Sequence, residues 1–183
     1  MDDARTFLDV DVVFGQRNGM AAAEWTRCTI AEHPQLPHLV RCVKAFLRRD
    51  GLNDVSRGGL GSHALTVAVA CYLTQVRRDC NRGEDEGADE ADGQGDITYA
   101  GLNLGGLLVG LMTSLGSLDI SDMALSIRHG GFVRKPKEWM TPDEYEASGR
   151  GREEGGVGGE AGGGEPRLGV EDPLVPGRNL CGG

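Results

Sequence analysis

The chain has 183 residues, a length that suits one or two small domains with a sizeable hydrophobic core. Hydrophobic residues make up 39% of it, but 30 glycines and few aromatic residues indicate a core interrupted by flexible segments. The apolar runs are too short for a membrane span, and the acidic N-terminal residues do not resemble a secretory signal. Five cysteines without a CxxC pair predict reduced thiols in an intracellular protein, and no zinc site.

The net charge of −9 is concentrated in two glycine-rich segments. Residues 84–96 carry seven acidic side chains and residues 153–165 carry four, with no basic residue in either segment. The rest of the chain is close to neutral, so charge neither requires nor excludes a polyanionic partner such as nucleic acid. We expect disordered inserts over residues 81–98 and 148–166.

The first predicted element is a β-strand over residues 7–14, where β-favouring residues alternate. Asp9 and Asp11 would project from one face about 7 Å apart, and carboxylates at a strand end can hold Mg²⁺. An edge strand with a solvated outer face would explain the same pair, so the pattern alone does not decide. A turn at Asn18-Gly19 and a short helix are expected to follow.

The clearest helical pattern lies over residues 36–50. Apolar residues recur there at three- and four-residue steps, and Arg41, Lys44 and Arg48 form a basic stripe away from that face. Gly51 is placed to end the helix.

A glycine-rich turn with Gly58 and Gly59 leads to an almost wholly apolar helix over residues 63–75, with Ser62 as its N-cap. Together with Lys44 and Arg48, the flexible backbone amides and the helix start predict a cradle for a triphosphate. The cradle is not a P-loop, because the chain contains no GxxxxGK[ST]. A solvated basic helix face is the alternative explanation of the two cations.

Residues 102–116 predict another buried helix, and residues 121–133 predict a short extended pair around His129-Gly130-Gly131. We expect His129 to serve the turn. No serine, histidine or cysteine has the surroundings that covalent catalysis requires.

Five segments, in order, resemble one family, the non-canonical poly(A) polymerases of the TRAMP type. This family belongs to the DNA polymerase β-like nucleotidyltransferases. VDVVF followed by QRNGMAAAEW resembles its third-carboxylate strand, and residues 36–65 resemble, without a gap, its stretch ending in GG-SSYSL. LNLGGLLVGLM, IRHGGFV and GVEDPLVPGRN resemble segments of its PAP-associated domain.

The resemblance implies roles for particular residues. Asp11 takes the place of the third metal-binding carboxylate, and Asn18 that of an asparagine near the nucleotide sugar. The phosphates would be held by Lys44, Arg48 and Ser62, next to Gly58 and Gly59. His63 stands in place of the tyrosine that stacks on the base, and a histidine ring stacks more weakly. Asn179 would belong to the loop that reads the base.

The fold class implied is mostly α. A helical central, PAP-associated domain over residues 21–147 would follow a remnant strand of an α/β nucleotidyltransferase palm over residues 1–20. Residues 167–183 would begin the base-recognition loop, which is truncated. The GS and DxD motifs that supply the family's first two metal carboxylates do not precede residue 7. We therefore expect a fragment that is inactive alone.

The function implied is template-independent addition of AMP from ATP to an RNA 3′ end, with Mg²⁺ or Mn²⁺ as the divalent metal. The resemblance also implies an RNA-binding partner subunit and a location in the nucleus, with the nucleolus left open. Terminal uridylyl transfer is the enzymatic alternative, because base choice lies in the truncated loop. A non-catalytic helical interaction module is the alternative of another class.

Overall fold

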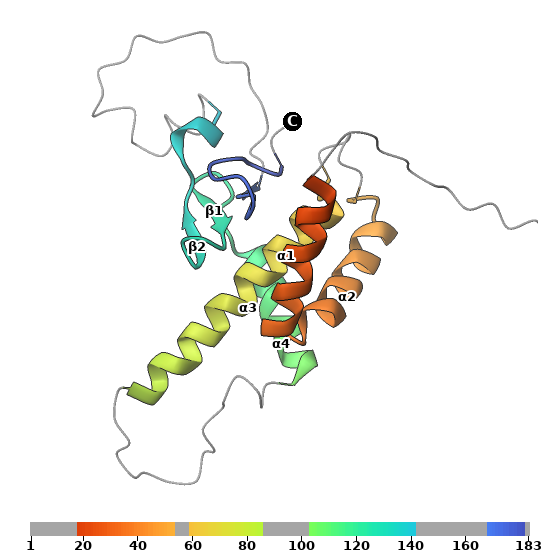
Figure 1. The fold of residues 1–183 in the computed structure, drawn as a ribbon, viewed down its shortest axis with the longest axis vertical. Coiled ribbons are helices and arrows are strands. Elements are labelled where there is room, and N and C mark those ends of the chain that lie inside the picture. Colours follow the sequence, from red (N-terminus) through yellow and green to blue (C-terminus); the bar gives the residue numbers. More distant parts are fainter. Residues whose placement is uncertain (1–17, 54–58, 86–102, 142–167, 182–183) are drawn as a thin grey trace, which may run out of the picture.

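The computed structural model describes residues 18–53, 59–85, 103–141 and 168–181 (Figure 1). The helices are α1 (Asn18–Glu32), α2 (Leu36–Arg49), α3 (Ser62–Asp85) and α4 (Leu104–Gly116). The remaining elements are β1 (Met123–Ser126), β2 (Gly131–Arg134), the short 3-10 helix η3 (Lys137–Trp139) and β3 (Gly169–Val170). The described part is mostly helical, as predicted.

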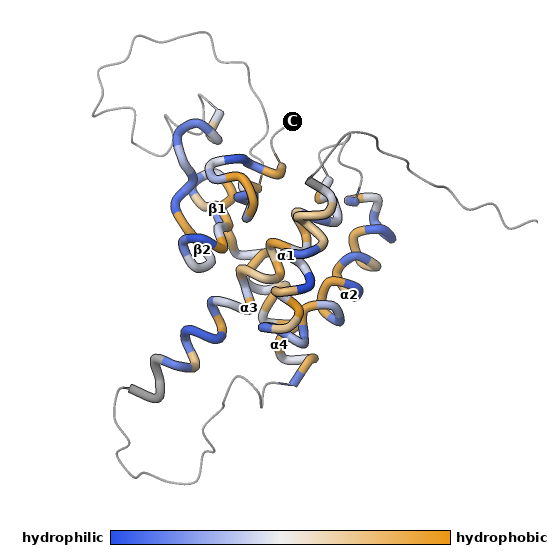
Figure 2. The backbone as a smooth tube through the Cα atoms, viewed as in Figure 1, coloured by the Kyte–Doolittle hydropathy of each residue, from blue (hydrophilic) through white to orange (hydrophobic). Residues whose placement is uncertain are grey.

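The first half of α3 is the centre of the hydrophobic core. Its residues from Val67 to Leu73 are almost completely buried, because neighbouring elements cover this half of the helix on all sides. On one side α3 packs against Leu36, Leu39 and Val43 of α2 and against α4. Figure 2 shows hydrophobic residues along this half of α3 and hydrophilic ones toward its far end.

The opposite side of α3 carries a small sheet with strand order β2-β1-β3. β1 pairs antiparallel with β2 and parallel with β3, so Gly169 and Val170 lie beside the hairpin. Leu125 and Val170 pack from the sheet onto Val67, Ala68 and Cys71 of α3. A single helix therefore carries both halves of the core.

The hairpin turn requires glycine and is held to α3. Gly130 has a φ of +87°, a conformation that residues with a Cβ rarely adopt. Its carbonyl oxygen accepts a hydrogen bond of 2.9 Å from Arg78 Nη1 of α3. The extended pair predicted over residues 121–133 is confirmed.

The helix predicted over residues 36–50 is also confirmed, and so is its end. Gly51 has a φ of +70°, and its N–H donates to the carbonyl of Arg48. Because apolar periodicity and the terminating glycine agree here, local sequence was sufficient.

Three helix predictions were wrong in their limits. Asn18 and Gly19 begin α1 instead of forming a turn, because the alanine run extends a helix that continues to Glu32. α3 runs to Asp85, past residue 75 and through the first five residues of the predicted acidic insert. Gly61, whose carbonyl accepts from Leu65 N at 2.9 Å, occupies the N-cap position predicted for Ser62.

The prediction that α4 is a buried helix was correct for one side only. Leu107 and Leu111 are buried, whereas Val109 is 67% exposed. An apolar run does not show which of its sides meets the core. The predicted palm strand over residues 7–14 and the inserts beyond Asp85 lie outside the described residues. Within the described residues, no helix combines the length and hydrophobicity that crossing a membrane requires.

Two glycines of α4 test the packing against α3. A Cβ at Gly110 would collide with the hydroxyl of the buried Tyr72, whereas a Cβ at Gly116 would meet nothing within 4 Å. We expect Gly110→Ala to lower the free energy of unfolding by about 1–3 kcal/mol through overpacking. Gly116→Ala should leave it unchanged or raise it by up to about 1 kcal/mol. Urea unfolding measures both, and equal stability of the two variants would contradict this packing.

Candidate functional site

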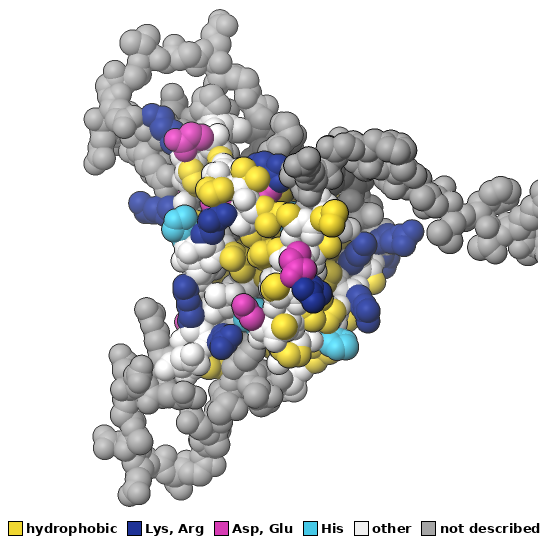
Figure 3. Space-filling view, viewed as in Figure 1, with side chains coloured by type: hydrophobic (Ala, Val, Ile, Leu, Met, Phe, Trp, Pro, Cys, Tyr) yellow, Lys and Arg dark blue, Asp and Glu magenta, His cyan; other side chains and the backbone are white. Residues whose placement is uncertain are grey.

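The cations predicted to hold phosphates lie on the outer side of α2. Lys44 and Arg48 are exposed, and Figure 3 shows Lys and Arg side chains along this helix. The adjacent Arg49 is engaged locally, since its Nε donates to Asp50 at 2.9 Å and its guanidinium lies 5.0 Å from the ring centre of Phe46. The two predicted cations thus face solvent at successive turns.

The end of α2 and the start of α3 are held together. Leu60 N donates to the carbonyl of Leu52 at 2.9 Å, which closes the connection between the helices. Gly59 and Ser62 therefore lie at the same end of the helical layer as Arg48. The first N–H groups of a helix point out of its start and favour anions.

His63 packs against α1 and lies near the chain's last segment. Its ring meets Trp25 edge to face, with the ring centres 5.9 Å apart and an angle of 84° between the planes. The charge of His63 also contributes to lowering the pKa of Asp172. The start of α3 is therefore a neighbour of the segment after β3.

Asp172 organises that segment, although no pattern in the sequence points to it. Its side chain is completely buried, accepts from Leu174 N at 2.8 Å and is bound by Arg178, whose Nε lies 2.7 Å away. Burial by itself raises the pKa of Asp172, but the Leu174 amide, Arg178 and the charge of His63 outweigh it, so the pKa is lowered.

Asn179 holds the same segment from the other end. Its side-chain oxygen accepts from Val170 N and from Cys181 N, each at 3.0 Å. Asn179 also forms a backbone bridge with Glu171. In this structure its carboxamide oxygen therefore binds the backbone of the segment predicted to read a base.

The remaining predicted site residues are only partly placed. Asn18 is the first residue of α1, while Asp11 and Gly58 lie outside the described residues. The structure thus places Arg48, Gly59 and Ser62 at one end of the helical layer and brings His63 near the segment that contains Asn179. In the part of the chain that the structure describes, no three His, Cys, Asp or Glu residues form a group that could hold a metal ion.

A second polar network joins the hairpin to the last segment. Glu171, 6% exposed, accepts hydrogen bonds from Ser126 Oγ and, at 3.1 Å, from Gly177 N. Ser126 Oγ also lies 2.9 Å from His129 Nδ1, whose distance to Glu171 Oε2 is 3.5 Å. In a catalytic triad the serine and the carboxylate bind different nitrogens of the histidine ring. Here both lie against Nδ1 of His129, so the three residues are not arranged to activate Ser126 as a nucleophile. His129 therefore also belongs to this polar network, in addition to its predicted role in the turn.

The network keeps Glu171 ionised. Burial raises the pKa of Glu171, but the bonds from Ser126 and Gly177 and the charges of His129 and Arg128 lower it by more, so its pKa lies below the ordinary value. Ser126 and Glu171 are 45 residues apart in sequence, so no local pattern could have paired them.

The chain resembles poly(A) RNA polymerases in sequence and in structure. Poly(A) RNA polymerase CID14 of Cryptococcus neoformans is 29% identical over 75% of this chain and 17% of its own length. Poly(A) RNA polymerase protein 1 of Saccharomyces cerevisiae is 32% identical over 73% of this chain and 19% of its own length. The polymerase core of TRAMP, described as an RNA surveillance complex, matches with a TM-score of 0.58 and 26% identity. That match covers 92% of this chain and 43% of the other.

This chain is a relative of the non-canonical poly(A) RNA polymerases. The resemblance predicted from its sequence is confirmed, and the chain spans less than a fifth of the length of the two curated relatives. No protein-family model matches it. Both relatives are named for poly(A), and neither is named for uridylyl transfer.

Acid should destabilise this relative of the poly(A) polymerases through Glu171. Because its folded-state pKa is lowered, the unfolded chain binds more protons at acid pH, and the stability that Glu171 confers above about pH 4.5 is lost as the pH falls through the folded-state pKa. Glu171→Gln should lower the free energy of unfolding at pH 7 by about 1–3 kcal/mol and flatten the acid dependence. Melting temperatures measured from about pH 7 to pH 3 test this.

The matched control is Glu24→Gln, which removes an exposed carboxylate that forms an ion pair with Arg27. It should keep the stability and the acid dependence of the unmodified chain, because exposed ion pairs contribute little. An acid dependence in Glu171→Gln equal to that of the unmodified chain would contradict the stabilising role of the Glu171 carboxylate.

Proposed function

We propose that the chain is the nucleotide-binding helical part of a poly(A) RNA polymerase, which adds AMP from ATP to the 3′ end of RNA without a template. The observation that carries the proposal is the match to the TRAMP polymerase core over 92% of this chain. The grouping of Arg48, Gly59 and Ser62 at one end of the helical layer supports it, since phosphates favour such a combination.

In the proposed reaction the RNA 3′-hydroxyl attacks the α-phosphate of ATP, and pyrophosphate leaves without a covalent enzyme intermediate. Lys44, Arg48 and Ser62 would bind the β- and γ-phosphates, and their charge and hydrogen bonds would stabilise the leaving pyrophosphate. The amides near Gly58 and Gly59 and the start of α3 would add to that positive field.

The base and sugar would be bound next to the phosphates. Asn18 is proposed to lie near the sugar, His63 to stack on the base and Asn179 to belong to the base-reading segment. Stacking on the base requires one face of the His63 ring to be open beside its perpendicular contact with Trp25. A weaker histidine stack would make base binding more dependent on the segment after β3.

A divalent metal, Mg²⁺ or Mn²⁺, enters the proposal through Asp11. The described residues by themselves do not fit a metal ion, because their acidic side chains are not grouped for it. The contributions proposed here are therefore those of the chain's own cations and amides. Because one predicted carboxylate cannot fix two metal ions, we propose that the chain contributes binding and not the full reaction.

An RNA-binding partner subunit and a nuclear location complete the proposal. The partner is supported by the description of the structural neighbour as the polymerase core of an RNA surveillance complex, and the nuclear location rests on the resemblance to TRAMP-type enzymes. The near-neutral remainder of the chain also supports a partner, since strong binding to RNA requires many cations.

Alanine variants on α2 test the proposed triphosphate site. We expect Lys44→Ala and Arg48→Ala each to weaken ATP binding by about tenfold or more, because each removes a charged contact to phosphate. Isothermal titration of the 183-residue chain with ATP measures the effect.

Arg41→Ala is the matched control, because Arg41 belongs to the same exposed stripe one turn earlier in α2. It should leave ATP affinity unchanged apart from a small, salt-screened effect. Equal losses in all three variants would show a diffuse basic face instead of a phosphate site and would contradict the proposal.

A further inference from the structure

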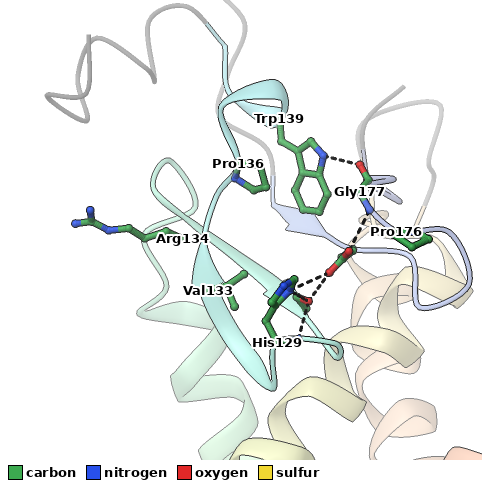
Figure 4. A pocket seen from close by; sticks show the side chains of 9 residues that line it. His129, Val133, Arg134, Pro136, Trp139, Pro176 and Gly177 are labelled. Atoms are coloured by element: carbon green, nitrogen blue, oxygen red, sulfur yellow. Dashed lines mark hydrogen bonds and ion pairs between the residues drawn. The ribbon is translucent and has the colours of Figure 1, made fainter. Parts of the chain in front are cut away.

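A pocket of about 480 Å³ lies between the hairpin, η3 and the segment after β3 (Figure 4). Its walls are mainly apolar, with Val133, Pro136, Trp139 and Pro176. Ser126, His129 and Glu171 supply its polar side. The described residues proposed to bind the nucleotide's phosphates and base are not among those that line it.

The pocket and the side chain of Asp172 lie on opposite sides of one extended segment. Glu171 and Asp172 are consecutive, and successive side chains of an extended chain point to opposite faces. Glu171 lines the pocket, whereas Asp172 binds Arg178 and lies near His63. The pocket is therefore a separate site that shares its backbone with the proposed nucleotide site.

Trp139 gives the pocket a fixed, flat wall. Its indole Nε1 donates to the carbonyl of Gly177 at 2.9 Å, and Figure 4 shows this bond across the top of the pocket. A Cβ at Gly169 would lie 3.2 Å from Cε3 of the ring, so the indole packs closely on that backbone. A ring held at both points suits stacking with a planar ligand.

Glu171 gives the pocket an acceptor. Its carboxylate binds Ser126 and Gly177 and lies 3.5 Å from Nδ1 of His129, but two carboxylate oxygens offer about four acceptor positions. A planar group with N–H donors would fit between this carboxylate and the indole. An amino-bearing nucleobase and the guanidinium of an arginine both have that chemistry.

The surrounding charge favours the nucleobase. Along the stretch from β1 to η3 the exposed cations Arg128, Arg134 and Lys137 outnumber the exposed acid Glu138. Arg134 lines the pocket, and its guanidinium points away from the interior (Figure 4), with its Nε 3.5 Å from the carboxylate of Asp122 and most of the side chain exposed. Such a rim repels a cationic arginine and attracts the phosphates that accompany a base.

We propose that this pocket binds an amino-bearing base of single-stranded RNA, stacked on Trp139 and hydrogen-bonded to Glu171, with the RNA phosphates toward Arg134. The inference rests on the proposed function, because it makes the polymerase's RNA substrate the ligand. It adds a second base-binding position, distinct from the one proposed for ATP.

The fluorescence of Trp139 tests the proposal directly. The chain has two tryptophans, so Trp25→Phe leaves Trp139 as the sole indole. Short oligoadenylate RNA should quench it, and Val133→Phe, which fills the pocket, should weaken that binding by about fivefold or more. Val109→Phe makes the same change on the exposed side of α4 and should have no effect. An oligomer of unsubstituted purine, which lacks the amino group, should bind several-fold more weakly than oligoadenylate.

Two results would overturn the proposal. One is unchanged oligoadenylate binding in Val133→Phe, with a melting temperature that shows an intact fold. The other is quenching by an arginine peptide but not by oligoadenylate, which would assign the pocket to a protein side chain. A failure of the proposed function can be told apart from a failure of this proposal. Loss of ATP binding on its own would leave the quenching of Trp139 by oligoadenylate intact.

Discussion

The burial of the first half of α3 is the constraint on which the rest of the structure depends. Its residues contact α2 and α4 on one side and the sheet on the other, so one helix fixes the relative positions of elements far apart in sequence. Apolar burial on this scale outweighs the conformational entropy lost by ordering short elements such as β3. The start of α3 is thereby held beside the end of α2, where anions are favoured.

The segment after β3 is the second determinant of the site. β3 itself has two residues, too few to hold a position alone. Glu171 ties it to the hairpin and Asp172 ties it to its own continuation through Arg178. A buried carboxylate is costly unless it is hydrogen-bonded or ion-paired. The two acids therefore favour the one position of the segment in which both have these partners. Its two faces then serve a proposed nucleotide site and the pocket beside Trp139.

The elements that local patterns determine could be predicted from the sequence. Periodicity located α2, and glycines located its end and the hairpin turn. The full lengths of α1 and α3 could not be predicted, because glycines and charges there resemble breaks while helix propensity and packing carry the helix onward. Asp172, Glu171 and Ser126 were missed because their importance comes from contacts formed only in the folded chain. The roles proposed for Lys44, Arg48 and Ser62 rest on the resemblance, because the pattern alone did not separate these residues from a solvated face.

Hydrogen–deuterium exchange with and without ATP is the most direct test of the central claim that triphosphate binds where the end of α2 meets the start of α3. Bound ATP should slow exchange at the backbone amides of residues 59–64, which lead into or begin α3. Protection confined to the hairpin, or no protection at the start of α3 at saturating ATP, would contradict it.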